Sequence, residues 1–362
     1  MSKKETFHGS DVEKIELLYG IKKENILQFS GNVNPLGLSN KLKNQLKEQL
    51  DVLSTYPDRD YKKLRSSIGE YCKCNPNHVV VGNGSTELIR HMIQTINPQS
   101  CLVIAPTYSE YAREIQLTGS TIDYFQLKEE DSFHLNIADL NTQLAKKYDI
   151  LVLCNPNNPT SSVLTQVELT EILIQCEKYH TYLMIDETYA EFVPQIEEIT
   201  AIPLCEKFEH LIVLRGVSKF YAAPGLRLGY AITSNQILLS SLELKKNPWS
   251  VNSIAELAGI LLFQDENYIQ ETKLLIQTEQ IRIYELLKSS SQFHPYEPHG
   301  NFILLKILDP TLRSHDYFVR AIKEGMMIRD CSDFMYLDDH FIRFCFLTPN
   351  DNDRLLQCLL RK

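Results

Sequence analysis

The segment that decides the fold runs from Arg215 to Tyr230 and reads RGVSKFYAAPGLRLGY. It follows an apolar run, Leu211 to Leu214, which predicts a buried strand. The loop after this strand carries Ser218 and Lys219, then a Pro-Gly turn and Arg227. A lysine amine can condense with an aldehyde as a Schiff base, and a hydroxyl with a guanidinium can hold a phosphate dianion. Taken alone, this lysine and arginine would be interpreted as ordinary solvated side chains on a surface loop. Whether they bind a ligand therefore depends on the other motifs of the chain.

A second motif, YLMIDETY from residue 182 to 189, places a carboxylate at the end of a strand. The strand is predicted to end at Ile185, with Asp186 directly after it. Open α/β sheets bind their ligands at this edge, where a carboxylate can pair with a protonated ring nitrogen. Tyr189, three residues later, could donate a hydrogen bond to the same ring. The alternative is a loop aspartate that caps a helix.

A third motif, ILVLCNPNNPT from residue 150 to 160, combines a strand with a loop. The apolar run Ile150 to Cys154 is typical of a buried parallel strand. Two prolines exclude a helix from the segment that follows. Within it, Asn158 is the candidate hydrogen-bond donor to a ligand, and an ordinary turn is the alternative.

A fourth motif, VVVGNGSTE from residue 79 to 87, predicts a strand, a glycine turn and a helix over residues 88–96. Backbone N–H groups at such a helix start, with hydroxyls beside them, form a phosphate cradle. Gly84, Ser85 and Thr86 are the predicted contacts. The competing interpretation is a dinucleotide site, but Glu87 stands where that fingerprint needs a small residue. A partial glycine fingerprint is weak evidence, so a nicotinamide enzyme is disfavoured.

Along the chain the phosphate turn comes first, then APTYSE (residues 105–110), the asparagine loop, the aspartate strand and the lysine loop. This order resembles the fold-type I pyridoxal-phosphate (PLP) enzymes over nearly the whole chain. The resemblance implies a PLP cofactor bound to Lys219 and paired through Asp186. It implies that Tyr108 stacks on the pyridine ring, and that Asn158 and Tyr189 bond its O3′ oxygen. The implied phosphate contacts are Gly84, Ser85, Thr86, Ser218, Arg227 and, from the neighbouring subunit of a homodimer with shared active sites, Tyr56.

Two C-terminal arginines, Arg329 and Arg343, resemble the clamp that holds the substrate carboxylate in this superfamily. Arginine suits that task because its planar fork pairs a carboxylate bidentately. Arg343 lies between Ile342 and Phe344 in an apolar strand, where a charge needs a partner.

The N-terminal segments HGS (residues 8–10) and SGNVNPLG (residues 30–37) resemble the threonine-phosphate decarboxylases of cobalamin biosynthesis. Their relatives, the histidinol-phosphate aminotransferases, usually carry an acidic residue where Val33 stands. The resemblance makes His8 and Asn32 substrate contacts, under an N-terminal segment that closes over the site. It implies PLP-dependent decarboxylation of O-phospho-L-threonine or O-phospho-L-serine to the phosphorylated amino alcohol.

Two alternatives stay open. One is an aminotransferase of the histidinol-phosphate type, and the other is a non-catalytic regulator, which usually has a DNA-binding domain ahead of this fold. Two positions depart from the family pattern: Gly216, where relatives carry a hydroxyl for the cofactor phosphate, and Leu347, near which they often have a further basic residue.

The composition agrees with a soluble enzyme, for which we expect a cytoplasmic location, and the resemblance implies a small phosphorylated amino acid as the substrate. A net charge of −9 over 362 residues argues against nucleic acid and anionic membranes as partners. No apolar run reaches membrane-spanning length. The nine cysteines, including Cys72 and Cys74, lack the spacing of a standard zinc site, so we expect reduced thiols and no metal.

The expected architecture is α/β, with an arm (residues 1–34), a large cofactor domain (35–248) and a smaller α+β domain (249–362). Helices and strands alternate over residues 61–233, which predicts a mostly parallel sheet with helices on both faces. A helix capped by Ser10 and ended by Gly20, a helix over residues 40–53 and a helix or helix pair over 253–287 are predicted, together with strands at 302–306, 327–329 and 341–346.

Overall fold

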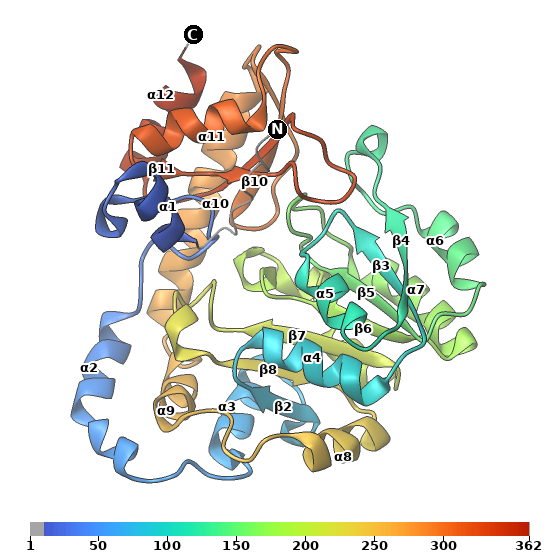
Figure 1. Ribbon diagram of the computed structural model, residues 1–362. Coiled ribbons are helices and arrows are strands. Elements are labelled where there is room, and N and C mark those ends of the chain that lie inside the picture. Colours follow the sequence, from blue (N-terminus) through green and yellow to red (C-terminus); the bar gives the residue numbers. More distant parts are fainter. Residues whose placement is uncertain (1–10, 362) are drawn as a thin grey trace.

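The structure is a computed structural model that describes residues 11–361. Its centre is a seven-stranded sheet in the order β2-β8-β7-β6-β5-β3-β4 (Figure 1). All neighbours in it are parallel except β8, which runs against both β2 and β7. The strands are β2 Val79–Gly82, β3 Ser100–Ala105, β4 Thr121–Gln126, β5 Ile150–Cys154, β6 Tyr182–Asp186, β7 Leu211–Gly216 and β8 Gly229–Ile232. The predicted mostly parallel α/β sheet is confirmed.

Helices cover both faces of this sheet. α4 (Ser85–Ile96) and α5 (Glu110–Gln116) pack together on one face, with α8 (Gln236–Lys245) beside them (Figure 1). Right-handed crossovers place α6 (Ile137–Leu144) and α7 (Gln166–Tyr179) on the other face. The continuous apolar runs of β5 and β7 are fully buried because of this double cover.

A second, antiparallel sheet has the order β12-β13-β10-β9. Its strands are β9 Phe293–Pro295, β10 Phe302–Ile307, β12 Arg329–Asp330 and β13 Phe341–Cys345. It carries α11 (Ser314–Lys323) and α12 (Pro349–Leu360). A short strand near the N-terminus, β1 (Leu27–Gln28), pairs in parallel with β11 (Met326–Met327), so the N-terminal segment is tied to the C-terminal part of the chain.

The predicted helix pair consists of α9 (Ser253–Leu262) and α10 (Glu266–Lys288). α9 packs on α2 (Asn40–Glu48) and α3 (Lys62–Cys72). A Cβ at Gly259 of α9 would lie 2.5 Å from the Leu64 side chain, so the two helices touch closely there. The domain boundary after residue 248 stays a prediction, and this contact joins α9 to the part that precedes it.

Three local predictions need correction. α1 spans Val12–Tyr19, and its N-cap residue is Asp11 rather than the predicted Ser10, which lies outside the described residues. Gly20 ends the helix with a backbone in the left-handed region, and the predicted end is correct. The helix predicted over 40–53 ends at Glu48, and a 3₁₀ turn, Leu50–Ser54, follows. The strand predicted over 327–329 is split between β11 and β12, because each half pairs with a different strand.

Among residues 11–361, no helix combines the length and apolar character that a membrane crossing requires.

Candidate active site

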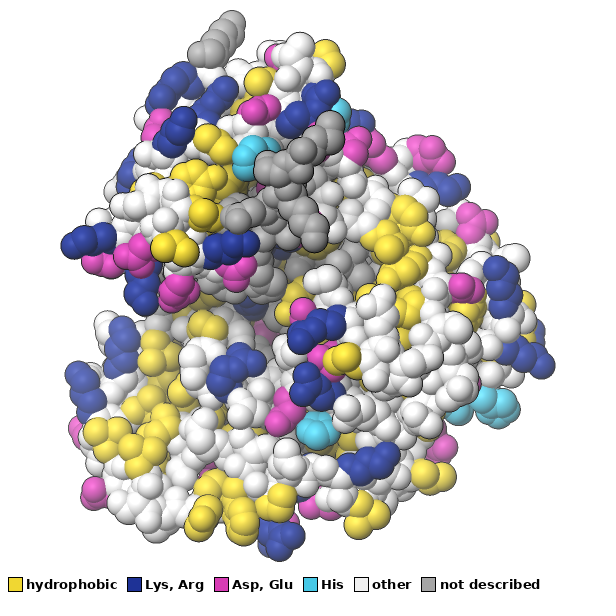
Figure 2. Space-filling model, viewed as in Figure 1, with side chains coloured by type: hydrophobic (Ala, Val, Ile, Leu, Met, Phe, Trp, Pro, Cys, Tyr) yellow, Lys and Arg dark blue, Asp and Glu magenta, His cyan; other side chains and the backbone are white. Residues whose placement is uncertain are grey.

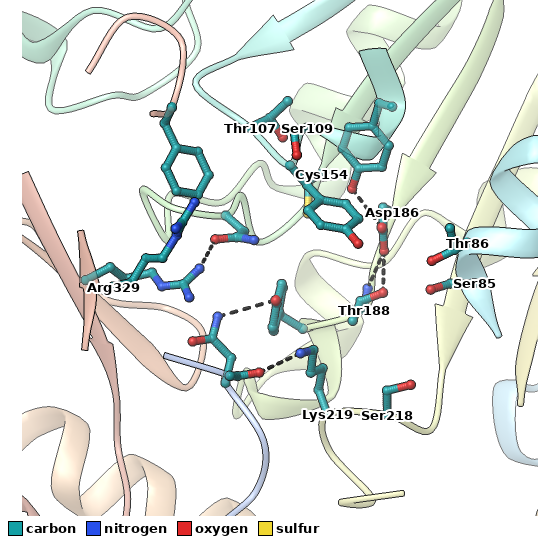
Figure 3. Close-up of a pocket in the computed structure, with 18 of the residues that line it drawn as sticks. Ser85, Thr86, Thr107, Ser109, Cys154, Asp186, Thr188, Ser218, Lys219 and Arg329 are labelled. Atoms are coloured by element: carbon teal, nitrogen blue, oxygen red, sulfur yellow. Dashed lines mark hydrogen bonds between the residues drawn. The ribbon is translucent and has the colours of Figure 1, made fainter. Parts of the chain in front are cut away.

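A cavity of about 460 Å³ lies at the carboxyl edge of the large sheet, between that edge, the second sheet and the N-terminal segment around Gly31 (Figure 3). Its size suits a small ligand. The loops after β2, β3, β5, β6 and β7 all reach it, because parallel strands deliver their ends to one edge. It is lined by twelve of the predicted site residues: Asn32, Ser85, Thr86, Tyr108, Asn158, Asp186, Tyr189, Ser218, Lys219, Arg227, Arg329 and Arg343.

Lys219 projects into the middle of this cavity, and its Nζ donates to the Gly31 carbonyl at 2.5 Å. Burial, followed by the positive charge of Arg343, lowers the pKa of the Lys219 amine to about 8. A substantial fraction of the amine is therefore neutral near physiological pH. This is the state in which an amine can attack a carbonyl or accept a proton.

Asp186 ends β6 and is only 5% exposed. One carboxylate oxygen accepts a hydrogen bond from the Tyr111 hydroxyl at 2.7 Å. The other accepts from the Thr188 backbone N–H at 2.9 Å and from its hydroxyl at 2.5 Å. Burial raises the pKa of Tyr111 well above its usual value, so the phenol stays protonated and remains a donor. These three donors fix the position of the carboxylate.

Tyr111 and Thr188 were missed by the sequence reasoning. Thr188 carries a readable signal, because an Asp with a Thr two residues later often forms a local side-chain turn. Tyr111 lies on α5, in another βα unit, and only the fold brings its hydroxyl to Asp186. Its ring also meets that of nearby Tyr108 edge-on, with centroids 5.6 Å apart. One buried phenol thus touches both a predicted stacking ring and the predicted carboxylate.

The wall of the cavity at the N-terminus of α4 is suited to bind a phosphate. Ser85 and Thr86 stand at the N-terminus of α4, and Figure 3 shows them on the same side of the cavity as Ser218. Gly84 does not line the cavity; its φ is +82°, and a Cβ there would collide with the Arg227 guanidinium. Gly84 therefore lets Arg227 approach the helix start. Hydroxyls, helix N–H groups and a guanidinium together match a phosphate dianion.

Several polar groups that line the cavity have hydrogen-bond donors or acceptors that are not used within the described chain. Tyr189 is buried, and its hydroxyl accepts from the Asn32 side chain at 3.3 Å. Arg343 donates to the Asn158 side-chain oxygen, which leaves the amide N–H₂ of Asn158 for another acceptor. Buried Asn32 Oδ1 and Arg343 Nε have no hydrogen-bond partner within the described chain. Buried polar atoms of this kind are expected to be satisfied by a ligand or by water.

The two arginines of the predicted clamp differ in their surroundings. Arg343 is 4% exposed, and it donates to Asn158 and to the Ser30 carbonyl at 2.6 Å. Arg329 lies across the cavity from Ser85 and Thr86 (Figure 3) and directs one guanidinium nitrogen at both carboxylate oxygens of Asp333, each at 2.7 Å. Asp333 was not among the predicted residues.

One predicted contact among the described residues, Tyr56, lies elsewhere. Tyr56 is 80% exposed, outside the cavity, and its ring packs against Trp249 with centroids 4.8 Å apart. Its predicted reach to a neighbouring subunit stays a prediction. His8 lies outside the described residues. Leu347, where a basic residue was considered, is 8% exposed and does not line the cavity.

The parallel sheet and the lysine-centred cavity define a PLP-dependent enzyme of fold type I, and the residues present fit this cofactor. The chain belongs to the class I and II aminotransferase family, whose pattern matches residues 24–359. PLP is the cofactor of this family and of this chain.

Three known proteins illustrate where the chain stands within the family. A threonine-phosphate decarboxylase of Salmonella typhimurium is 32% identical over 97% of this chain and 95% of its own length. The crystal structure of a histidinol-phosphate aminotransferase from Clostridium acetobutylicum superposes with a TM-score of 0.86 at 30% identity, covering 91% of this chain and 97% of that one. An L-threonine-O-3-phosphate decarboxylase from Porphyromonas gingivalis, at 22% identity and a TM-score of 0.79 over 91% and 98% of the two chains, shares the fold.

Proposed function

We propose that this protein decarboxylates O-phospho-L-threonine, or the closely similar O-phospho-L-serine, and releases carbon dioxide and the phosphorylated amino alcohol. The similarity that carries this proposal is the 32% identity, over nearly the full length of both chains, to a protein named threonine-phosphate decarboxylase. The cavity is compatible with such a substrate, because Arg329 and Arg343 offer two guanidinium groups to a ligand with two anionic groups.

We assign the cofactor contacts as follows. Lys219 anchors PLP covalently, and Asp186 faces its ring nitrogen. Tyr108 stacks on the ring, while Asn158 and Tyr189 bond the ring oxygen. The phosphate is held by Ser85, Thr86, Ser218 and Arg227, with Gly84 shaping the turn. This assignment is supported by the common cavity that these side chains line and by the fit of Gly84 to Arg227.

When bound, PLP provides an electron sink conjugated to the substrate Cα. Asp186, fixed by Tyr111 and Thr188, keeps the ring nitrogen protonated. Arg343, Asn32 and, in our proposal, His8 would hold the substrate anions, and this hold would decide which bond at Cα breaks. Lys219, with its pKa near 8, carries the proton that replaces the carboxylate at Cα.

The aminotransferase alternative rests on the 30% identity to a histidinol-phosphate aminotransferase of closely similar structure. Such an enzyme would keep the substrate carboxylate and break the Cα–H bond instead. The same arginines, lysine and aspartate serve both reactions.

Product analysis separates the two functions. Purified PLP-loaded protein is given O-phospho-L-threonine or O-phospho-L-serine without any keto acid, and carbon dioxide and the phosphorylated amine are measured. We expect turnover to the amine, with the better substrate naming the enzyme. Absence of carbon dioxide, together with glutamate formed from histidinol phosphate and 2-oxoglutarate, would establish the aminotransferase instead.

We further propose a cytoplasmic homodimer in which Tyr56 reaches the partner's cofactor phosphate. Its exposed ring beside Trp249 supports a contact outside its own subunit. All nine cysteines are free thiols, which fits a reducing compartment. Sedimentation analysis of wild-type protein tests the dimer, and a monomer that still binds PLP tightly would refute the assignment of Tyr56.

A further inference from the structure

A loop after β12 forms the wall of the cavity that faces away from the cofactor phosphate. Asp333, Phe334 and Met335 of this loop all line the cavity. The Arg329 guanidinium lies over the Phe334 ring, 5.1 Å from its centroid. Both oxygens of Asp333 lie 2.7 Å from Arg329 Nη2. The loop therefore brings a carboxylate of the chain itself onto a guanidinium that is predicted to bind a substrate anion.

This pair is not an ordinary surface ion pair. The side chain of Arg329 is 13% exposed and that of Asp333 is 29% exposed, so both are partly withdrawn from water. Screening is weaker in such a place than on an open surface, and the attraction is correspondingly stronger. An incoming anion that uses Arg329 must replace the Asp333 carboxylate or share the guanidinium with it.

Arg343 is in a different situation. Its hydrogen bonds go to two neutral oxygens, on Asn158 and on Ser30, and its Nε has no partner within the described chain. Its pKa is lowered first by burial, and the charge of Arg329 lowers it further. The two guanidinium groups are thus close enough to repel each other. Of the hydrogen bonds described here, those of Arg329 go to a carboxylate, whereas those of Arg343 go to neutral oxygens.

The position of Lys219 indicates which arginine would bind which anionic group of the substrate. Lys219 donates to the Gly31 carbonyl and Arg343 to the carbonyl of the neighbouring Ser30, so these two side chains meet at the same short segment. The substrate carboxylate is attached to the same carbon as the amine that meets the Lys219 position, so the carboxylate belongs near Arg343. The phosphate, several bonds farther along the substrate, then reaches toward Arg329 at the loop.

We propose that Asp333 is a displaceable counter-ion of Arg329: it competes with the phosphate of the substrate and returns to Arg329 when the product leaves. The inference rests on the proposed function, because it assumes a substrate with both a carboxylate and a phosphate. Decarboxylation removes the group that Arg343 holds, so the product keeps only its phosphate as an anchor. A carboxylate that competes for Arg329 weakens this last contact and so speeds release, a step that often limits turnover.

The test replaces Asp333→Asn, which keeps the size of the side chain and removes its charge. Binding of inorganic phosphate to PLP-loaded protein is measured by calorimetry, without any turnover. We expect phosphate to bind about tenfold more tightly to D333N, since a competing charge-assisted contact of about 1.4 kcal/mol is lost. Asp338→Asn is the matched control, because it removes the same charge from an exposed side chain outside the cavity.

Unchanged or weaker phosphate binding by D333N would overturn the proposal, as would an equal gain in D338N, which would reveal a general charge effect. A double-mutant cycle covers local rearrangement: in an Arg329→Gln background, D333N should no longer tighten phosphate binding, and a persisting gain would refute the pairing. Because phosphate binding needs no reaction, these results stand even if the decarboxylase function fails. If that function holds, D333N should also show about tenfold stronger inhibition by the phosphorylated product.

Discussion

The two ends of the cavity are built in different ways. The cofactor end is formed by loops that directly follow strands of one parallel sheet, so Ser85, Asp186 and Lys219 are brought together by the regular geometry of βα units. The substrate end combines the segment around Asn32, the Asn158 loop and the second sheet with Arg343. The comparison teaches that one end follows from local motifs in sequence, whereas the other depends on how distant parts of the chain pack.

The largest effect is expected at the cofactor end. Lys219→Ala removes both the covalent anchor and the proton carrier, so turnover should fall by about 10³-fold or more. The measurement is the rate of product formation, together with the absorbance of cofactor that stays bound through denaturing gel filtration after borohydride has reduced the Schiff base to a stable amine. Lys245→Ala, an exposed lysine of α8, is the control. Retention of the covalently bound cofactor by K219A would refute the assignment of the anchor.

A smaller, unequal effect is expected at the substrate end. Arg343→Gln removes a buried charge whose partners are neutral, and KM should rise about 100-fold; Arg329→Gln should cost only about tenfold, because Asp333 already competes for that charge. Steady-state kinetics on both variants measures the difference. Equal losses would show that the two arginines do not play the distinct roles described above.

A variant of Tyr111 tests whether a residue outside the sequence motifs contributes to cofactor binding. Tyr111→Phe deletes a hydrogen bond to the Asp186 carboxylate, and the Kd for PLP should rise about tenfold. Fluorescence titration of apoprotein measures it. The control is Tyr148→Phe, which breaks a part-buried hydrogen bond from a tyrosine to Asp123, outside the cavity. A carbon analogue of PLP without the ring nitrogen should abolish the Y111F effect, and an undiminished effect would contradict action through Asp186.

The smallest expected effect is a shift of the Lys219 pKa, at the cofactor end of the cavity, when the charge of Arg343 at the substrate end is removed. The Lys219 amine must be neutral to react, and with a pKa of about 8 its rate of PLP uptake should rise with pH through this value and level off above it. Arg343→Gln removes a positive charge that lowers this pKa, so the Lys219 pKa rises and the half-maximal rate moves to higher pH. Burial is the larger cause, so the shift should be partial. Stopped-flow uptake by apoprotein across pH 6–10 checks it, and a shift to lower pH would contradict the electrostatic coupling.

Much of the fold could be read from the sequence because parallel strands buried on both faces leave strong signals. The apolar runs of β5, β6 and β7 and the glycine turn before α4 lie where they were expected. The errors fall where pairing partners decide the ends of an element. Residues 327–329 form two short strands, since β11 pairs with β1 while β12 pairs with β13.

The sequence by itself determined the class of fold and the chemistry of the cofactor end, because each motif there needs only its own strand and the following loop. Only the tertiary structure placed Tyr111 against Asp186 and turned Asp333 onto Arg329. The first contact joins two different βα units, and the second depends on how one loop folds back on its strand. The first contact leaves no periodic or spacing signal in the sequence. The second joins residues only four apart, a spacing that implies contact within a helix but not between a strand and the loop after it. Both depend on the three-dimensional proximity and direction of the two side chains.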